Sequence, residues 1–271
     1  MPNVTHFLKS FKTPIIFAVI SILIYYSFAY NLERTEYAKL ISLYLILFFL
    51  FFKIVGNERI STNSLIWLSF GFRAIFLLAI PNLSQDFYRF IWDGRMILEG
   101  FNPYLYTPEF FISKSNSPIN QAQILYDGMG VLNGSHFTNY PPLNQLCFVI
   151  TNLFTKHSIL GSIVGLRFLI TAADYGTLFF GKKLLKRLEL PEKNIFLYFL
   201  NPFVIIELTG NLHFEGVMIF FLVWSLYLLD VGRWKFAALV LALSISVKLI
   251  PLLFLPLFFQ KLGWKKSVIF Y

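Results

Sequence analysis

The carboxylates of one polar stretch, residues 82–141, are the side chains best placed to do chemistry. The stretch holds five of the 14 acidic residues of the chain: Asp86, Asp93, Glu99, Glu109 and Asp127. Asp86 follows within a few residues of a long apolar run, so it is partly desolvated and suited to take a proton as a general base. A helix cap, or an ion pair with Arg89, is the structural alternative for Asp86.

Spacing predicts that Asp86 lies in the first turn of an amphipathic helix. Residues at i, i+3, i+4 and i+7 share one helical face, and here they are Asp86, Arg89, Phe90 and Asp93. Ser84 is a suitable N-cap, and Gly100 is a suitable end. The apolar side chains between them suit a helix that lies at a membrane surface.

The polar stretch closes with Tyr140-Pro141-Pro142-Leu143. Because each proline fixes its own φ and keeps the preceding residue out of the helical region, this sequence predicts a rigid extended entry into a helix. A tyrosine is also a typical anchor at a membrane interface. A simple turn before a helix is the alternative interpretation.

The elements that position these residues belong to a membrane protein. The chain has 271 residues, of which 57% are apolar and only 14% are charged, and its mean hydropathy is +0.66. Soluble domains have roughly 45–50% apolar and about 25% charged residues. The sequence therefore predicts an all-α polytopic membrane protein. Apolar runs approaching the length of a spanning helix lie at 14–30, 38–55, 65–81, 158–180, 194–209 and 214–230.

Two further apolar segments are predicted not to span. Residues 142–155 are too few and are expected to lie on the outer face. Residues 236–259 are interrupted by Lys248, Pro251 and Pro256, and we expect a shallow hairpin with Lys248 near its outer tip.

The basic residues predict the orientation. Positive residues concentrate in cytoplasmic loops, and the strongest such signal is the cluster Lys182, Lys183, Lys186, Arg187 and Lys193. Lys9 and Lys12 place the N-terminus in the cytoplasm, and three crossings then place residues 82–141 outside. The net charge of +9 is then a topology signal, and nucleic acid is not an expected partner.

The predicted organisation has two parts. Residues 1–60 form an N-terminal transmembrane hairpin, and residues 61–271 form the module that carries the site, with its outer loop at 82–157. Because Ser267–Tyr271 reads as the start of another span, we expect the chain to be truncated at its C-terminus.

Several motifs, in this order, resemble the GT-C superfamily of membrane glycosyltransferases. They are Asp86-Phe-Tyr-Arg with Trp92-Asp93-Gly94, Asn102-Pro103-Tyr104, Tyr140-Pro-Pro-Leu143, Arg167 with Asp174, Asn201-Pro202, the loop Gly210–Gly216, and Ser246–Pro251. They cover residues of about 65–259. The nearest similarity is to bacterial mannosyltransferases that use polyprenol-phosphate-mannose. The first mannosyltransferase of glycosylphosphatidylinositol synthesis and the dolichol-linked glucosyltransferases are more distantly similar.

The resemblance implies a GT-C-like helical bundle with juxtamembrane helices on a long outer loop. It implies an inverting transferase that moves a hexose, with mannose favoured, from a polyprenyl-phosphate carrier to a lipid-linked or glycan acceptor. Asp86 would be the general base, and Asp93 would assist or orient. The active site would face outward from a bacterial inner membrane, among membrane lipids. Asn139 stands where related enzymes often have an acid.

The remaining candidates follow from this interpretation. Lys248, Arg89 and Arg95 are candidates for the donor phosphate, with snorkelling to lipid head groups as the alternative for Lys248. Candidates for the sugar or acceptor are Tyr140, His213, Glu215 and Glu207. A polar loop at the water boundary is the alternative for the last three. No metal-ligand spacing is present, so no metal site is predicted, although a divalent metal is left open as a cofactor.

A transporter or flippase for a lipid-linked or small polar solute is the competing hypothesis. It predicts essential charges near the bilayer midplane and not in the outer loop. Arg167 and Asp174, two helical turns apart within one span, are expected to form a structural ion pair. No internal repeat of the kind common in transporters is visible.

Overall fold

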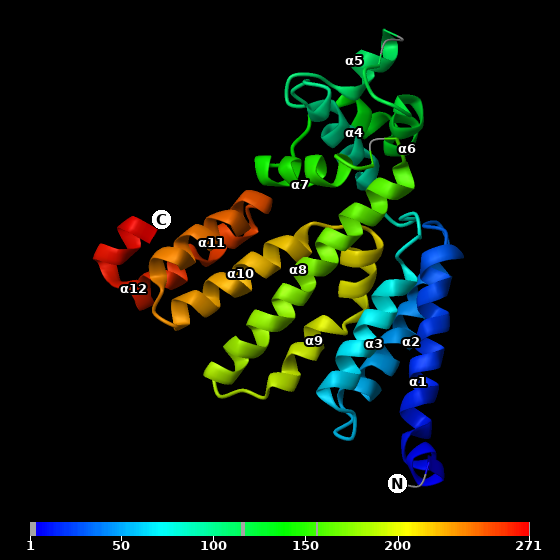
Figure 1. Cartoon of the computed structure of the whole chain (residues 1–271), viewed down its shortest axis with the longest axis vertical. Coiled ribbons are helices and arrows are strands. Elements are labelled where there is room, and N and C mark those ends of the chain that lie inside the picture. Colours follow the sequence, from blue (N-terminus) through cyan, green and yellow to red (C-terminus); the bar gives the residue numbers. More distant parts are fainter. Residues whose placement is uncertain (1–3, 115–116, 156, 271) are drawn as a thin grey trace. The chain divides into compact units, whose positions relative to one another are not determined.

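The computed structural model describes residues 4–114, 117–155 and 157–270, and no strand occurs among them (Figure 1). Three helical segments are long and apolar enough to cross a membrane: Lys12–Tyr30, Tyr37–Val55 and Ile159–Arg187. Val204–Gly210 and Glu215–Asp230 together make a fourth candidate, as a broken span or a re-entrant loop. The predicted fold class, an all-α polytopic membrane protein, is confirmed.

The helices pack as two compact units. The first comprises Met1–Leu83 and Lys193–Asn211, and the second comprises Ser84–Glu192 and Leu212–Tyr271. These units are defined by contacts between helices. The predicted boundary at residue 60 separates an N-terminal hairpin from the module that carries the site, and it stays a prediction. Tyr271, at the end of the predicted additional span, lies outside the described residues.

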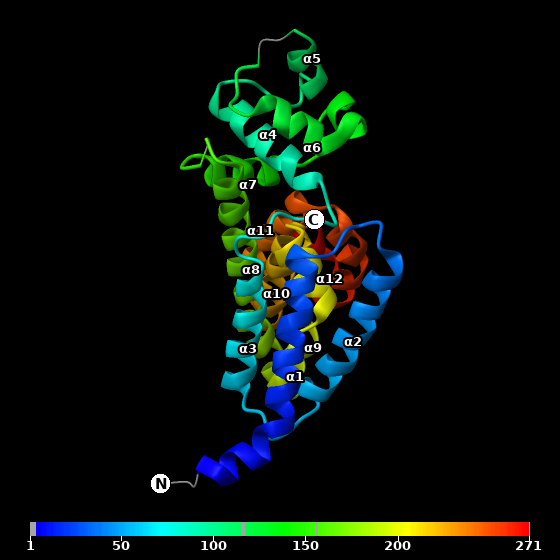
Figure 2. The ribbon, with the colours of Figure 1, turned by 90° about the vertical axis from the view of Figure 1, so that its right-hand side faces the viewer.

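The first unit is built on three helices and a short irregular return. Its helices are α1 (Val4–Tyr30), α2 (Tyr37–Val55), α3 (Thr62–Ile75), α9 (Phe196–Phe199) and the π-helical turn η2 (Val204–Gly210). The short helix η1 (Glu192–Ile195) leads into α9. Helix α1 packs against both α2 and α3, which flank it in Figure 2. The rings of Tyr25 and Phe72 meet at 4.7 Å between these helices.

Two of the predicted spans are wrong as continuous helices. The run 65–81 is helical only up to Ile75, where the 14-residue helix α3 ends. A turn follows, and Pro81 keeps Ile80 out of the helical region. The run 194–209 breaks into η1, α9 and η2. Pro202 explains this break, since it removes a backbone donor and restricts Asn201.

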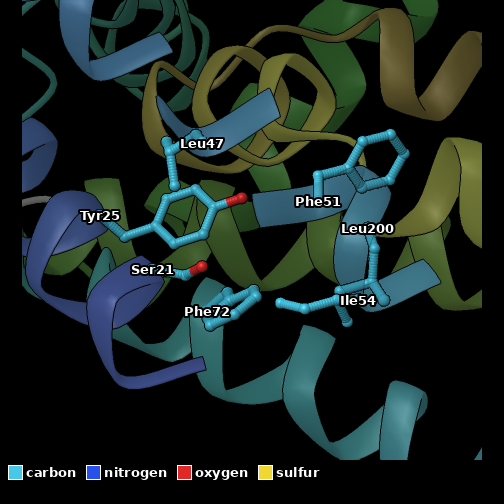
Figure 3. A pocket seen from close by; sticks show the side chains of 7 residues that line it. All are labelled: Ser21, Tyr25, Leu47, Phe51, Ile54, Phe72 and Leu200. Atoms are coloured by element: carbon cyan, nitrogen blue, oxygen red, sulfur yellow. The ribbon is translucent and has the colours of Figure 1, made fainter. Parts of the chain in front are cut away.

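A small cavity lies in the core of the first unit (Figure 3). Its lining residues are Ser21, Tyr25, Leu47, Phe51, Ile54, Phe72 and Leu200, and its volume is about 10 Å³. That is room for about one water molecule. The Ser21 hydroxyl donates to the carbonyl of Phe17 within its own helix. The cavity is therefore too small and too apolar to serve as a substrate site.

The second unit carries the outer stretch and the remaining helices. They are α4 (Asp86–Leu98), α5 (Pro108–Ser113), α6 (Ala122–Ser135), α7 (Pro142–Asn152), α8 (Ile159–Arg187), α10 (Glu215–Asp230), α11 (Trp234–Val247), η3 (Ile250–Phe254) and α12 (Leu255–Phe270). Helix α10 packs against both α8 and α11, and the three run side by side in Figure 1. The stacked rings of Phe180 and Trp224, 5.1 Å apart, join α8 to α10.

The predicted helix after Asp86 is present, with one change at its start. Gln85 is the N-cap of α4 and makes no side-chain cap bond, whereas the Ser84 hydroxyl accepts from the Asp86 amide at 3.4 Å. Ser84 therefore acts through a tight turn one residue before the helix. Gly100 follows the helix with φ +84°, a backbone conformation that favours glycine. The prediction that the helix ends there is confirmed.

The predicted break at Lys248 is also present. Helix α11 ends at Val247, and Lys248 adopts an extended backbone with φ −156° and ψ 141° before η3 begins at Ile250. Pro251 lies at the start of η3, where the missing amide costs no helical bond. The break exposes Lys248 at the end of α11.

Candidate active site

A polar cleft of about 610 Å³ lies within the second unit. Its lining residues come from four places in the chain: Asp86, Phe90, Asn139, Tyr140, Pro141, Asn144, His213, Phe214, Glu215, Val247, Lys248, Leu249 and Ile250. The volume lies within the range of small-molecule sites. Five of the nine predicted site residues are among them: Asp86, Tyr140, His213, Glu215 and Lys248.

Three helices begin at this cleft. Helix α4 starts at Asp86, α7 at Pro142 beside the cleft residues 139–141, and α10 at Glu215. The first turn of a helix has free backbone N–H groups and a partial positive charge. Three such ends therefore meet one cavity, whose lining also carries two carboxylates, Asp86 and Glu215, and one ammonium group, Lys248.

Asp86 is half-buried in the wall of the cleft. Within the described part of the chain, its carboxylate makes no hydrogen bond or ion pair. The structural alternative, an ion pair with Arg89, is not formed, because Arg89 is bound to Asp93. Asp86 is therefore a carboxylate placed in a cleft with its oxygens available to a ligand.

Aromatic rings support the cleft and hold its three helix starts together. Phe90 stacks on Phe148 at 4.6 Å and meets Phe214 edge-on at 5.5 Å. The ring of Tyr140 lies 4.8 Å from Phe90 and 5.7 Å from Phe148. This cluster joins α4, α7 and the start of α10, so it sets the spacing of the polar groups at the cleft.

Tyr140 presents its ring to this cluster and its hydroxyl toward the acids. Burial raises the pKa of Tyr140, and the carboxylates of Asp86, Asp93 and Glu215 raise it further. Its hydroxyl therefore keeps its proton at neutral pH and can donate a hydrogen bond. The Tyr140 carbonyl accepts from the hydroxyl of Tyr104 at 2.6 Å, which fixes the extended segment.

Asp93 lies behind the cleft wall and does not line it. Its side chain is fully buried and accepts from Arg89 Nε at 2.8 Å and Gln145 Nε2 at 2.9 Å. Burial raises the pKa of the Asp93 carboxyl, while Arg89 and the neighbouring amide lower it. Arg89 also donates to the carbonyls of Asn133 and His136. The pair ties α4 to α7 and to the segment that leads to Tyr140.

Arg95 is likewise buried away from the cleft. It donates to the carbonyl of Asn120 at 2.8 Å and to Gln121 Oε1 at 3.3 Å. Burial lowers the pKa of Arg95 to about 10, so it stays charged at neutral pH. Both arginines predicted for the phosphate thus serve to hold the outer stretch together, and neither reaches the cleft.

Lys248 is the cation of the cleft. It forms an ion pair with Glu215, so the end of α11 is held against the start of α10. Both side chains remain partly exposed, which leaves the ammonium group accessible to an anion in the cleft. His213 lines the cleft beside Glu215.

Glu207 belongs to the first unit and does not line the cleft. It accepts hydrogen bonds from the Tyr44 hydroxyl and from Asn211 Nδ2, both at 3.0 Å. Among the described residues, no group of three or more His, Cys, Asp or Glu side chains could hold a metal ion.

The sequence interpretation did not single out Asn144, which lines the cleft from the first turn of α7. The available signal was a polar residue two positions after Pro142, in the first turn of the helix. Asn139, noted for its place before Tyr140, also lines the cleft.

The fold and cleft together define a class: an all-α membrane protein with a cleft at the starts of three helices, lined by two carboxylates and a lysine. The chain belongs to the family described as alpha-(1->6)-mannopyranosyltransferase, N-terminal domain, whose model matches residues 33–262. The predicted resemblance to membrane mannosyltransferases of the GT-C type is thereby confirmed.

One curated relative is alpha-(1->6)-mannopyranosyltransferase B of Corynebacterium glutamicum. It is 24% identical over 207 residues, which cover 71% of this chain and 33% of the relative. The matched part of the chain thus spans about one third of the length of that protein. No solved structure matches the chain.

Proposed function

We propose that the protein is an inverting glycosyltransferase that moves a hexose, most simply mannose, from a polyprenyl-phosphate carrier to a glycan or lipid acceptor. The family supports the sugar, since its description names a mannopyranosyltransferase. The observation that carries the mechanism is the carboxylate of Asp86, which lines the cleft without a protein partner.

Asp86 takes the proton of the acceptor hydroxyl as its oxygen attacks the anomeric carbon. The new bond forms between that oxygen and the anomeric carbon, and the bond from this carbon to the phosphate oxygen breaks. The electron pair leaves with the polyprenyl phosphate. Glu215, the other carboxylate of the cleft, is engaged by Lys248. One free carboxylate suits a single in-line displacement, whereas retention requires a second carboxylate as nucleophile.

Lys248 offers a positive charge to the phosphate that leaves. The three helix starts at the cleft contribute in the same direction, because their N–H groups favour developing negative charge. The apolar neighbours Val247, Leu249 and Ile250 line the same end of the cleft and suit the first carbons of a polyprenyl chain.

Contacts within each unit support the proposed orientation, with the cleft outside. Lys193 donates to the carbonyl of Asn57 at 2.9 Å, joining two loops that are both assigned to the cytoplasm. In the second unit, Arg187 pairs with Asp230, and these residues too are assigned inside. The cleft lies at the opposite end of α10, where Glu215 lines it together with residues of the outer stretch.

Asp86→Asn tests the proposal. The amide cannot accept the acceptor proton, so kcat for transfer from mannosyl phosphoryl polyprenol should fall by about 100-fold or more, while membrane insertion is unchanged. Asp127→Asn is the matched control, because Asp127 is exposed, accepts from Gln123 and does not line the cleft. Near-normal turnover by Asp86→Asn contradicts the mechanism.

A further inference from the structure

Asn144 is a buried amide in the wall of the cleft. Its side chain is only 4% exposed, and its Oδ1 atom has no hydrogen-bond partner in the described part of the chain. An asparagine oxygen accepts up to two hydrogen bonds. A buried acceptor left without one is unfavourable and calls for an explanation. Among the buried unpartnered polar atoms of the described residues, this one alone belongs to a residue that lines the cleft.

The other amides of α7 show what a structural role looks like on this helix. Asn152, at the far end, donates to the Phe148 carbonyl at 2.8 Å and accepts from the Ser162 hydroxyl at 2.8 Å. Gln145, the next residue after Asn144, donates through Nε2 to Asp93 and Thr138, although its own Oε1 also lacks a partner and does not line the cleft. Asn144 makes no side-chain hydrogen bond of this kind. It does not cap the helix either, because the N-cap residue of α7 is Pro141.

We propose that Asn144 binds a hydroxyl group of the sugar substrate through Oδ1. This inference rests on the transferase function proposed above and adds a residue that determines sugar specificity. A pyranose hydroxyl is a suitable partner because it donates one hydrogen bond and accepts others. An anion is not a partner for Oδ1, since both groups only accept.

The neighbours of Asn144 favour the same ligand. Asp86 and Tyr140 line the cleft with it, so one wall presents a carboxylate, a protonated phenol and an amide. This combination accepts from hydroxyls and donates to them within a small volume. Phe90 and Phe214 also line the cleft and suit the apolar C–H face of a pyranose ring; Phe148 packs behind them.

The test compares Asn144→Leu with Asn152→Leu in the full chain, purified in detergent. Asn144→Leu removes no protein hydrogen bond, so its Tm should equal or exceed that of the wild type. Its kcat/KM for mannosyl phosphoryl polyprenol should fall about 10-fold. Asn152→Leu should lower Tm and leave donor KM unchanged. Asn144→Ala, which adds no bulk, should repeat the kinetic loss if leucine perturbs folding.

Monodeoxy analogues identify the hydroxyl. For the wild type, removing one particular hydroxyl, from either the donor or a mannoside acceptor, should lower kcat/KM about 10-fold relative to the intact substrate. For Asn144→Leu, the same analogue should lower kcat/KM less than 2-fold. The substrate that carries this deoxy position tells whether Asn144 binds donor or acceptor.

Three results overturn the inference. The first is a fall in Tm for Asn144→Leu as large as that for Asn152→Leu. The second is wild-type kinetics for both Asn144 variants. The third is that every deoxy analogue lowers kcat/KM equally in the wild type and in Asn144→Leu. Each of these leaves transfer by the wild type intact, so the proposed function stands. Absence of both transfer and thermal stabilisation by the donor in the wild type would overturn both proposals.

Discussion

At the scale of single residues, the polar side chains of the outer stretch form two groups: those whose polar atoms are bonded within the protein, and those with atoms that no described residue binds. Asp93, Arg89 and Arg95 have the right types for catalysis or phosphate binding, yet they are buried and bonded to one another or to backbone carbonyls. Asp86 and Asn144 lie in the cleft with oxygens that no described residue binds. The proposed roles therefore depend more on whether a side chain can reach a ligand in the cleft than on its residue type.

Lys248→Met tests the proposed phosphate contact. A charge-assisted contact to phosphate is worth about 1.5–3 kcal/mol, so the donor KM should rise roughly 10- to 100-fold while acceptor KM changes little. Steady-state kinetics with mannosyl phosphoryl polyprenol measures both. Lys261→Met is the matched control, because Lys261 also pairs with an acid, Asp230 at 3.4 Å, but lies away from the cleft. Equal effects of the two variants would exclude a specific role for Lys248.

At the scale of elements, the cleft depends on close packing of α4 against α7. Gly94 lies where α4 meets the backbone of α7. A Cβ atom at this position would lie 2.6 Å from the Phe148 carbonyl oxygen and 2.7 Å from Asn152 Nδ2. Backbone cannot give way as a flexible side chain can, so glycine is required by this approach. The glycine of the Trp92-Asp93-Gly94 motif is thus explained by packing.

Gly94→Ala should therefore push the two helices apart. We expect a loss of about 1–3 kcal/mol in stability and a lower Tm, together with reduced transfer because Asp86 and Asn144 lie on the two helices concerned. Thermal unfolding in detergent measures the first effect. Gly71→Ala in α3 is the control, since nothing lies within 4 Å of its added methyl group. A Tm unchanged by Gly94→Ala would contradict the packing argument.

The buried pair of Arg89 and Asp93 should behave as a positioning device. Asp93→Asn leaves a buried guanidinium without its counter-charge, and Arg89→Met does the reverse, so each should cost about 3–5 kcal/mol. The double variant should cost less than the sum of the two, because it leaves no charge uncompensated. Tm values of the four proteins complete the cycle. Additive losses would show that the two side chains act independently.

At the scale of the whole molecule, the few charged residues fall into two groups: basic residues that indicate membrane topology, and acidic residues concentrated in the stretch that carries the site. Clustered cations such as Lys182 and Lys186 mark the proposed cytoplasmic side, and a third of the acids lie in the stretch 82–141. The broken pair of η2 and α10 places Glu215 at a helix start. A helix end inside a membrane protein is tolerated where it lines a cavity.

Single-cysteine labelling tests the orientation. Glu109→Cys should react with a membrane-impermeant maleimide added to intact cells, whereas Lys186→Cys should react only after permeabilisation. The background carries Cys147→Ser, although the native thiol is a weak competitor, since burial raises its pKa to about 11. Both positions are exposed, so labelling reports sidedness. The reverse pattern would place the cleft in the cytoplasm.

Local patterns in the sequence determined the membrane class, the helix from Asp86 to the turn at Gly100, and the break at Lys248. Each depends on composition or on neighbours within a few residues, so each is readable from the chain. Pro202 explains the break in the predicted span 194–209, whereas α3 ends at Ile75, six positions before Pro81.

Only the tertiary structure decided which polar groups share a cleft. Asp86, Asn144, Glu215 and Lys248 are separated by up to 162 positions in the chain, yet they line one cavity. Spacing placed Asp86 and Asp93 on the same face of a helix. In the structure, however, Arg89 and Gln145 donate hydrogen bonds to the buried carboxylate of Asp93, which therefore does not reach the cleft. Hydrogen bonding and burial among distant segments determine which side chains remain available, and no periodicity within one segment encodes that.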